Sequence, residues 1–188
     1  MARLERLTVR PARLEDADVL VGFSAAMALE TEGRTLDREQ LRRGTLAVLK
    51  SPARGFYLVA ERLGGASREV VGQLLVTYEW SDWRNATFWW IQSVYVHPNW
   101  RRQGVYRRMH EAVFTQARAR KDVCGLRLYV ERENRMAQAV YRRVGLTPSS
   151  YLVFDEDFVL ARRDHRSKLA KGRGAPIPSK RKASLMKR

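Results

Sequence analysis

The chain has 188 residues, of which 45% are hydrophobic, and a formal net charge of +16. The hydrophobic fraction excludes an intrinsically disordered protein, and the length is sufficient for one domain with a real core. A single cysteine, Cys124, excludes a disulfide framework within the chain and predicts a reducing, cytoplasmic location. No run of about 18 apolar residues occurs, so we expect no membrane span, and the first residues predict no signal peptide.

The first half of the sequence predicts a strand, two helices and a hairpin. Residues 7–10 form a short β-rich run that Pro11 ends. Apolar residues at helical spacing predict helices over 14–29 and from about 35 to 49, with Gly33 at the break between them and Thr35 or Asp37 as the second N-cap. Two further β-rich runs, 56–60 and 70–78, flank the glycine-containing turn at 64–67 and predict an antiparallel hairpin.

The second half predicts alternating strands and helices. Residues 89–96 are aromatic or β-branched apart from two positions, which predicts a largely buried strand, and a helix follows from about residue 102. A strand over 126–130 and a helix over 137–144 come next, followed by two late strands over 151–154 and 158–160. The 89–96 and 126–130 strands are joined through a helix, so they should be parallel neighbours. This order predicts an α/β (α+β) fold with a mixed sheet and helices on both faces.

The basic charge is concentrated at the C-terminal end. Residues 162–188 contain 11 Lys or Arg and one acidic residue, Asp164. This segment has glycines, prolines and few large apolar residues, so it cannot bury enough surface to fold alone. We therefore predict a domain over 1–161 and a basic tail over 162–188, mobile beyond about residue 171. A solvated extension is favoured over nucleic acid contact, because the tail has no aromatic residue for base stacking.

Two motifs carry a family resemblance. Gly104 lies where a helix begins, and the unpaired N–H groups of a helix N-terminus suit an anion. Residues 101–106, Arg-Arg-Gln-Gly-Val-Tyr, resemble the (Arg/Gln)-x-x-Gly-x-(Gly/Ala) acyl-CoA signature of the GNAT superfamily of N-acetyltransferases, although Tyr106 departs from it. Residues 134–146 resemble the family's downstream Asn-x-x-Ala-x-x-x-Tyr-x-x-x-Gly-Phe block, with Leu146 in place of Phe. Both blocks occur in the right order, and the resemblance covers roughly residues 5–160.

The resemblance implies a GNAT fold, in which a mostly antiparallel sheet is splayed at a central parallel strand pair and acetyl-CoA enters the gap as co-substrate. The strand edge would hydrogen-bond the pantetheine amides, and the helix start would hold the pyrophosphate. Asn134 would help to hold the cofactor or would serve as a helix N-cap, and the arginines would contact phosphate or remain solvated. The implied cofactor-binding residues are Val94, Tyr95, Val96, Arg101, Arg102, Gln103, Gly104, Val105, Tyr106, Arg107 and Asn134.

The activity that the resemblance implies is transfer of an acetyl group to a primary amine by direct attack, without a covalent enzyme intermediate. Tyr141 matches the family tyrosine that protonates the CoA thiolate, and its alternative role is a core aromatic on the 137–144 helix. Gln92 stands near the position where related enzymes often carry a glutamate, but an amide cannot accept a proton at neutral pH. It would instead orient a water molecule or the acetyl carbonyl.

Two acidic pairs are candidates for the acceptor site. Glu30 and Glu32 lie at the break between the first helices, and Glu79 and Asp82 lie just before the 89–96 strand. Together they suggest a site for a cationic amine of polyamine or aminoglycoside type, or for a protein amine. The walls and cation–π attraction would come from five aromatic residues: Tyr78, Trp80, Trp83, Trp89 and Trp90. The alternatives are solvated loop acids, edge-strand packing or a homodimer contact.

Two other function classes remain open. The basic tail is compatible with a nucleic-acid- or ribosome-associated protein. Because Gln92 stands in place of a possible base, the chain is also compatible with an acyl-CoA-binding module that does not catalyse acetyl transfer. His97 and His110 have no partner at ligand spacing, so we expect surface residues and no metal site.

Overall fold

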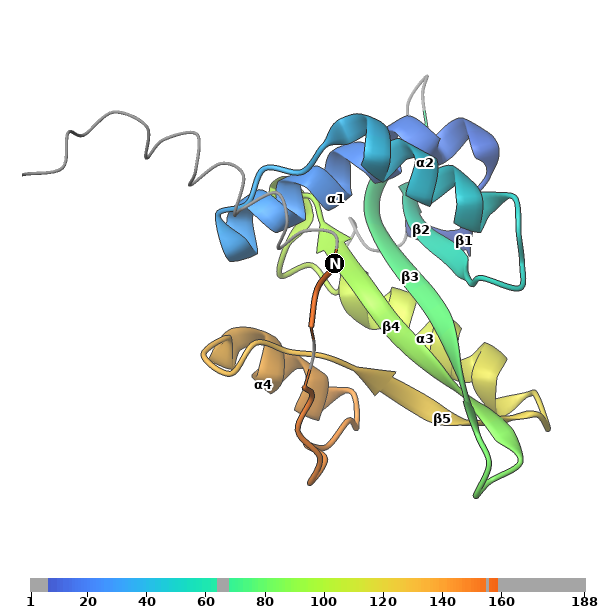
Figure 1. The fold of residues 1–188 in the computed structure, drawn as a ribbon. Helices are drawn as coiled ribbons and strands as arrows, with labels where there is room; N and C mark the ends of the chain where they lie inside the picture. The colour runs from blue at the N-terminus through green and yellow to red at the C-terminus, as the bar shows by residue number, and fades with distance from the viewer. Residues whose placement is uncertain (1–6, 64–67, 155, 159–188) are drawn as a thin grey trace, which may run out of the picture. The chain divides into compact units, whose positions relative to one another are not determined.

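The computed structural model describes residues 7–63, 68–154 and 156–158, and the chain divides into two compact units, Met1–Thr147 and Pro148–Arg188. All helices and strands that the structure describes belong to the first unit (Figure 1). In chain order they are β1 (Leu7–Pro11), the 3₁₀ turn η1 (Leu14–Asp16), α1 (Ala17–Glu32), α2 (Arg38–Leu49), β2 (Phe56–Arg62), β3 (Glu69–Ser81), β4 (Ala86–Val96), the 3₁₀ turn η2 (Pro98–Trp100), α3 (Val105–Arg118), β5 (Val123–Leu128) and α4 (Arg135–Arg143).

The strands within the described residues form one five-stranded sheet in the order β1-β2-β3-β4-β5. The pairs from β1 to β4 are antiparallel, whereas β5 runs parallel to β4. The predicted mixed sheet, its parallel pair and the β2–β3 hairpin are confirmed. The turn of that hairpin, 64–67, lies outside the described residues.

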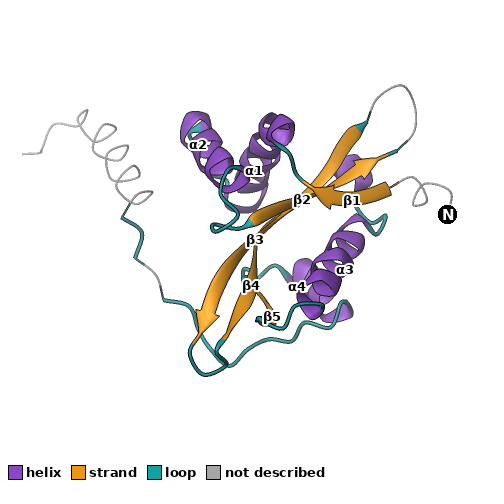
Figure 2. Cartoon of the chain, turned by 90° about the vertical axis from the view of Figure 1, so that its right-hand side faces the viewer, coloured by secondary structure: helices purple, strands orange, loops and turns teal. Residues whose placement is uncertain are grey.

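Helices cover both faces of the sheet, as predicted. Figure 2 shows α1 and α2 on one side of the strands and α3 and α4 on the other. The break between α1 and α2 has a local cause, because Gly33 adopts a left-handed conformation with φ 62°. Asp37 then starts α2 by accepting hydrogen bonds from the N–H groups of Glu39 and Gln40, so the second of the two predicted caps is used.

The larger core lies between the sheet and α3. Val105, Met109 and Val113 of α3 are at most 1% exposed and pack on strand residues that include Leu74, Val76, Trp89 and Ile91. Each such side chain contributes about 1.5–3 kcal/mol when fully buried, so this face fixes α3 firmly against β4. On the other face, Leu20 of α1 packs on Tyr57 and Val59.

A buried ion cluster joins β1, η1 and β2. The Arg10 guanidinium donates to both Asp16 carboxylate oxygens, at 2.7 and 3.0 Å, and to Glu61 Oε1 at 2.8 Å. Asp16 is 7% exposed and Glu61 is 3% exposed. The hydrogen bond from Arg10 lowers the pKa of Glu61. Burial raises the pKa of Asp16, but hydrogen bonds from the Arg10 side chain and the Arg13 N–H outweigh it, and the net shift is downward.

The predicted late strand over 151–154 is wrong. These four residues are between 64% and 90% exposed and have no regular secondary structure. Their β-rich composition is not sufficient, because a strand is stable only when a neighbouring strand pairs with it, and the structure describes no such partner. The end of the other late strand, 159–160, the domain boundary at 161 and the basic tail lie outside the described residues.

Two further findings concern the described residues only. No helix in this part of the chain has both the length and the apolar character needed to cross a membrane. Among the same residues, His, Cys, Asp and Glu side chains do not gather in groups of three or more that could hold a metal ion.

Candidate active site

The parallel strands β4 and β5 separate partway along the sheet. Pairing between them runs from Thr87 to Ile91, and the partner of Ile91 is Leu128, the last residue of β5. β4 continues to Val96 with β3 as its neighbour, and Figure 1 shows β4 and β5 diverging beyond their paired segment. Opposite the step from Leu75 to Val76, Gln92 is an extra residue in β4, which makes a β-bulge at the point of divergence.

The segment of β4 beyond the bulge offers backbone groups to a ligand. The His97 N–H donates to Val71 O of β3 at 2.9 Å. Backbone groups alternate in direction along a strand, so the N–H groups of Tyr95 and His97 face β3, and those of Val94 and Val96 face the diverging edge. This edge fits an extended chain with amide groups, such as pantetheine.

The N-terminus of α3 offers a second set of backbone donors. Gly104 is its N-cap, with φ 76° and no side-chain cap, and Arg102 also has a positive φ of 61°. The Arg108 N–H makes the first helical hydrogen bond, to Gly104 O at 3.1 Å. The N–H groups of residues 105–107 therefore precede the hydrogen-bonded helix and carry its partial positive charge, which suits a pyrophosphate.

Replacing Gly104 with valine should weaken acetyl-CoA binding at least tenfold. A side chain in the left-handed conformation costs about 1–2 kcal/mol, and relief of that strain would turn the amides of residues 105–107 away from the anion. Isothermal titration with acetyl-CoA measures the effect. Gly33→Val is the matched control, because Gly33 has a similar φ of 62° but ends α1 instead of starting α3. Equal affinities for wild type and Gly104→Val would contradict this role.

The arginine at the start of the motif bonds protein groups. Arg101 Nη2 lies 2.6 Å from Glu30 Oε2, and Arg101 Nε donates to Val96 O at 2.9 Å. Its guanidinium also lies over the Tyr95 ring, and the Tyr95 hydroxyl donates to Glu30 at 2.8 Å. Arg101, which we predicted to contact phosphate, thus ties the end of α1 to the end of β4, whereas Arg102 is exposed.

Tyr141 lies on α4 and faces α3. Its ring packs edge-on against the Tyr106 ring, with centroids 5.6 Å apart. Burial raises the pKa values of both phenols, so the Tyr141 hydroxyl stays protonated at neutral pH and can act as an acid. Asn134 accepts a hydrogen bond from the Ala137 N–H at 3.0 Å, which confirms its alternative role as the N-cap of α4.

His110 is not a surface residue, contrary to our expectation. It is 4% exposed and lies one helical turn from both Tyr106 and Phe114, with ring centroids 5.9 and 6.3 Å away. Burial disfavours the charged form of the His110 imidazole and therefore lowers its pKa. The sequence signal was the i, i+4 spacing of these three rings, which marks a common helix face.

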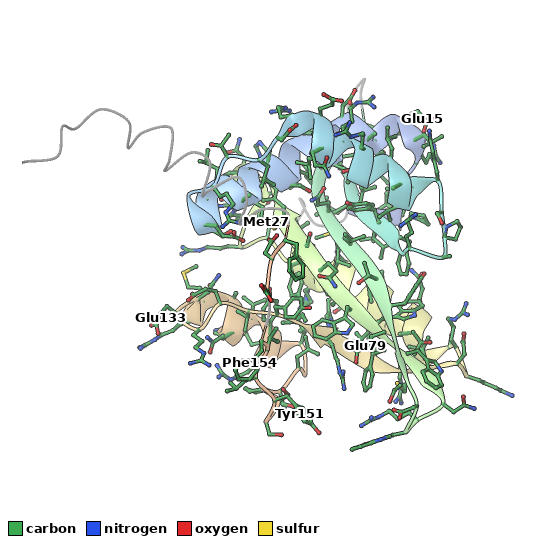
Figure 3. The ribbon with its side chains drawn as sticks, in the orientation of Figure 1. Glu15, Met27, Glu79, Glu133, Tyr151 and Phe154 are labelled. Carbon is green, nitrogen blue, oxygen red and sulfur yellow. The ribbon has the colours of Figure 1, made fainter. Side chains whose placement is uncertain are left out.

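The structure does not bring the four candidate acids together. Glu30 binds Arg101 and Tyr95, whereas Glu79 Oε1 lies 2.6 Å from Arg127 Nη1 and Glu79 Oε2 accepts from Trp90 Nε1. Burial raises the pKa of Glu30, but the hydrogen bonds from Arg101 and Tyr95 lower it overall, so this carboxylate is a poor base. Figure 3 shows Glu79, a residue of β3, away from Met27 of α1, and Glu30 lies near the end of the same helix as Met27.

The remaining predicted acceptor residues are also dispersed. Glu32 lies 4.0 Å from Arg34, Asp82 accepts from the Trp83 N–H in the β3–β4 turn, and Gln92 donates to Thr77 at 2.9 Å. The five aromatic residues do not form one wall. Trp89 packs with Tyr78 and Phe56, Trp90 packs at a tilt against Tyr129, and Trp80 and Trp83 are largely exposed near the hairpin end.

Arg127 is the residue that sequence reasoning missed. It lies opposite Trp90 in the β4–β5 register, and its guanidinium carbon is 3.7 Å from the centroid of the Phe88 ring. Gly125 leaves room for that ring, because a Cβ there would lie 2.8 Å from Phe88 Cε1. A charged residue within a predicted strand was the available signal, since such a side chain needs a partner on the sheet face.

Comparisons with known proteins agree with this arrangement. The model of the Acetyltransferase (GNAT) family matches residues 16–146. A possible acetyltransferase from Clostridium difficile 630 is 36% identical in its solved structure, with a TM-score of 0.75 over 81% of this chain and 98% of that chain. No curated protein sequence matches the chain.

Two aminoglycoside acetyltransferases show the same fold at lower identity. AAC(6')-Iy, solved in complex with CoA, is 13% identical, with a TM-score of 0.65 over 81% of this chain and 95% of that chain. The enzyme meta-AAC0020 from an uncultured soil metagenomic sample, solved with sisomicin, is 16% identical, with a TM-score of 0.63 over 82% and 97%. The family match spans both motifs, the diverging strands and the start of α3. The chain therefore belongs to the GNAT family of acetyltransferases, whose members use acetyl-CoA.

Proposed function

We propose that this protein is an N-acetyltransferase that moves the acetyl group of acetyl-CoA directly to a primary amine. The observation that carries the proposal is the divergence of β4 from β5 beside the uncapped N-terminus of α3. An exposed strand edge and a cluster of helix N–H groups fit the two chemically different parts of one ligand, the pantetheine amides and the pyrophosphate.

The backbone of the chain holds the cofactor in this proposal. The N–H groups of residues 103–107 bind the pyrophosphate, and Val94 and Val96 hydrogen-bond the pantetheine. Arg101 supports this edge through its bond to Val96 O. When bound, acetyl-CoA supplies the acyl thioester. Holding the thioester and the amine in a reactive geometry accounts for about 7–11 kcal/mol of barrier lowering in well-oriented systems.

Tyr141 completes the transfer as the general acid. The amine nitrogen forms a bond to the thioester carbonyl carbon, the carbon–sulfur bond breaks, and the Tyr141 hydroxyl donates its proton to the departing thiolate. The amine releases its proton to water, because the Glu30 and Glu79 carboxylates are already bonded to arginines. Tyr141 regains a proton from solvent before the next cycle.

Acetyl-CoA turnover with a panel of primary amines tests the proposal. We expect release of free thiol that depends on both acetyl-CoA and an amine, with the acetylated amine identified by mass spectrometry. Binding of acetyl-CoA without amine-dependent thiol release would identify an acyl-CoA-binding module. If acetyl-CoA does not bind, the enzymatic function is excluded. Salt-dependent RNA binding that is lost on deletion of residues 172–188 would favour a nucleic-acid-associated role.

A further inference from the structure

The face of the sheet opposite α3 carries an aromatic surface at the point where β4 and β5 diverge. Trp89 and Ile91 belong to the core under α3. Because side chains alternate along a strand, their neighbours Phe88 and Trp90 face the opposite side of the sheet. The Trp90 and Tyr129 rings are in contact, with centroids 4.5 Å apart and a tilt of 38° between their planes, and Arg127 covers Phe88. Tyr129 is 52% exposed, so this surface is accessible to a ligand.

This surface lies where an acceptor would meet the thioester, an argument that rests on the proposed function. Trp90 is two residues before the bulge at Gln92, and Tyr129 directly follows the end of β5. The cofactor would approach along the α3 side, because the pyrophosphate donors are at the start of α3. The amine must then approach the carbonyl carbon of the thioester from the opposite face of the sheet, where Trp90 and Tyr129 lie beside the point at which β4 and β5 diverge.

The charge of the surface argues against acceptors with several positive charges. Both oxygens of Glu79 are used, one by Arg127 Nη1 and one by Trp90 Nε1. The Glu79–Arg127 pair has no net charge, and the guanidinium side of the pair lies on the aromatic rings. A second or third ammonium group would find the Glu79 carboxylate already paired and would be repelled by Arg127. A planar apolar group, by contrast, stacks favourably on exposed aromatic side chains.

We infer that Arg127 is a specificity-determining residue that selects acceptors with one amine attached to a planar ring. By neutralising Glu79 it disfavours polyamines and aminoglycosides, whose recognition needs free carboxylates. Replacement of Arg127 by an uncharged side chain of similar length would release the Glu79 carboxylate on the same surface. The acceptor preference would then change in favour of polycations.

The test compares kcat/KM for three acceptors: 2-phenylethylamine, spermidine and kanamycin. The wild-type protein should prefer 2-phenylethylamine at least tenfold over the other two. Arg127→Met should raise the spermidine to 2-phenylethylamine ratio at least tenfold, and Arg127→Met combined with Glu79→Gln should reverse that gain. Arg127→Lys should keep the wild-type order. Arg43→Met is the matched control, because Arg43 makes a similar ion pair with Glu39 on α2, at 3.1 Å.

Direct binding separates this inference from the proposed function. Isothermal titration of the same three amines into the CoA-loaded protein should give the same ranking even if no turnover occurs. A wild-type preference for spermidine or kanamycin would overturn the inference while leaving the acetyltransferase intact. An Arg127→Met ratio equal to the wild-type ratio would overturn it as well. Thermal unfolding of each variant shows whether a loss of activity reflects loss of the fold.

Discussion

Replacing Tyr141 with phenylalanine should lower kcat by a factor of about 10²–10⁴, the usual contribution of a positioned general acid. The ring would keep its edge-on contact with Tyr106, so α4 should stay in place. Only the proton donor would be lost, and a thiolate would have to leave unprotonated. Burial raises the pKa of Tyr141 above its ordinary value near 10, so any alkaline decline in wild-type activity due to this group should lie above that pH.

The control for this substitution is Tyr57→Phe. Tyr57 is a buried tyrosine of β2 that packs with Leu20 under α1 and has no part in the proposed site. The Tyr57→Phe variant should therefore retain the wild-type kcat. Isothermal titration should show the same acetyl-CoA affinity for Tyr141→Phe and wild type, since the hydroxyl acts after binding. Unchanged turnover in Tyr141→Phe would exclude this residue as the acid.

Replacing Arg10 with methionine should lower the free energy of unfolding by about 3–5 kcal/mol, the usual cost of removing one member of a buried ion pair. Asp16 and Glu61 would remain buried without the guanidinium that bonds three of their four oxygens. Urea denaturation of both proteins at neutral pH measures the difference. Arg42→Met provides the control, because the Arg42–Asp18 pair is exposed and should contribute less than about 1 kcal/mol.

The difference in the free energy of unfolding between wild type and Arg10→Met should depend on pH in one direction. The pKa values of Asp16 and Glu61 are lowered in the folded protein, so their contribution is present above the unfolded values of about 4 and is lost as the pH falls below them. The difference between wild type and Arg10→Met should therefore be largest near neutral pH and should shrink below pH of about 4. A difference that stays constant down to about pH 2 would show that Arg10 stabilises the fold through packing alone.

Local chemistry made the strand and the turn next to the proposed cofactor site predictable. Aromatic and β-branched residues marked β4, and Gly104 marked the turn into α3 because only glycine adopts φ 76° without strain. The helix starts at Val105, directly after Gly104, although helical spacing alone placed its start near residue 102. Arg102 at φ 61° belongs to the turn, a conformation that a non-glycine residue rarely adopts and that propensity cannot reveal. The divergence of the strands was available only through the family resemblance.

The acceptor side was harder to predict because its charges are paired over long sequence distances. Glu30 and Arg101 are 71 residues apart, and Glu79 and Arg127 are 48 residues apart. A sequence shows the acids but not the partners that neutralise them. The separation of Trp89 from Trp90 could have been anticipated, since adjacent residues of a strand face opposite sides of a sheet. Treating both as one wall ignored that periodicity.

The bulge at Gln92 lets a single strand serve both helical layers in turn. Before it, the odd-numbered Trp89 and Ile91 join the α3 core; after it, odd-numbered Tyr95 packs on Phe23 of α1. The extra residue thus inverts the alternation, which moves Val94 and Val96 to the α3 side. A regular strand of the same sequence, without the bulge, would turn the tyrosine toward α3 and the valines toward α1. The bulge, as much as the composition of this strand, determines which side chains accompany the edge of β4 that diverges from β5.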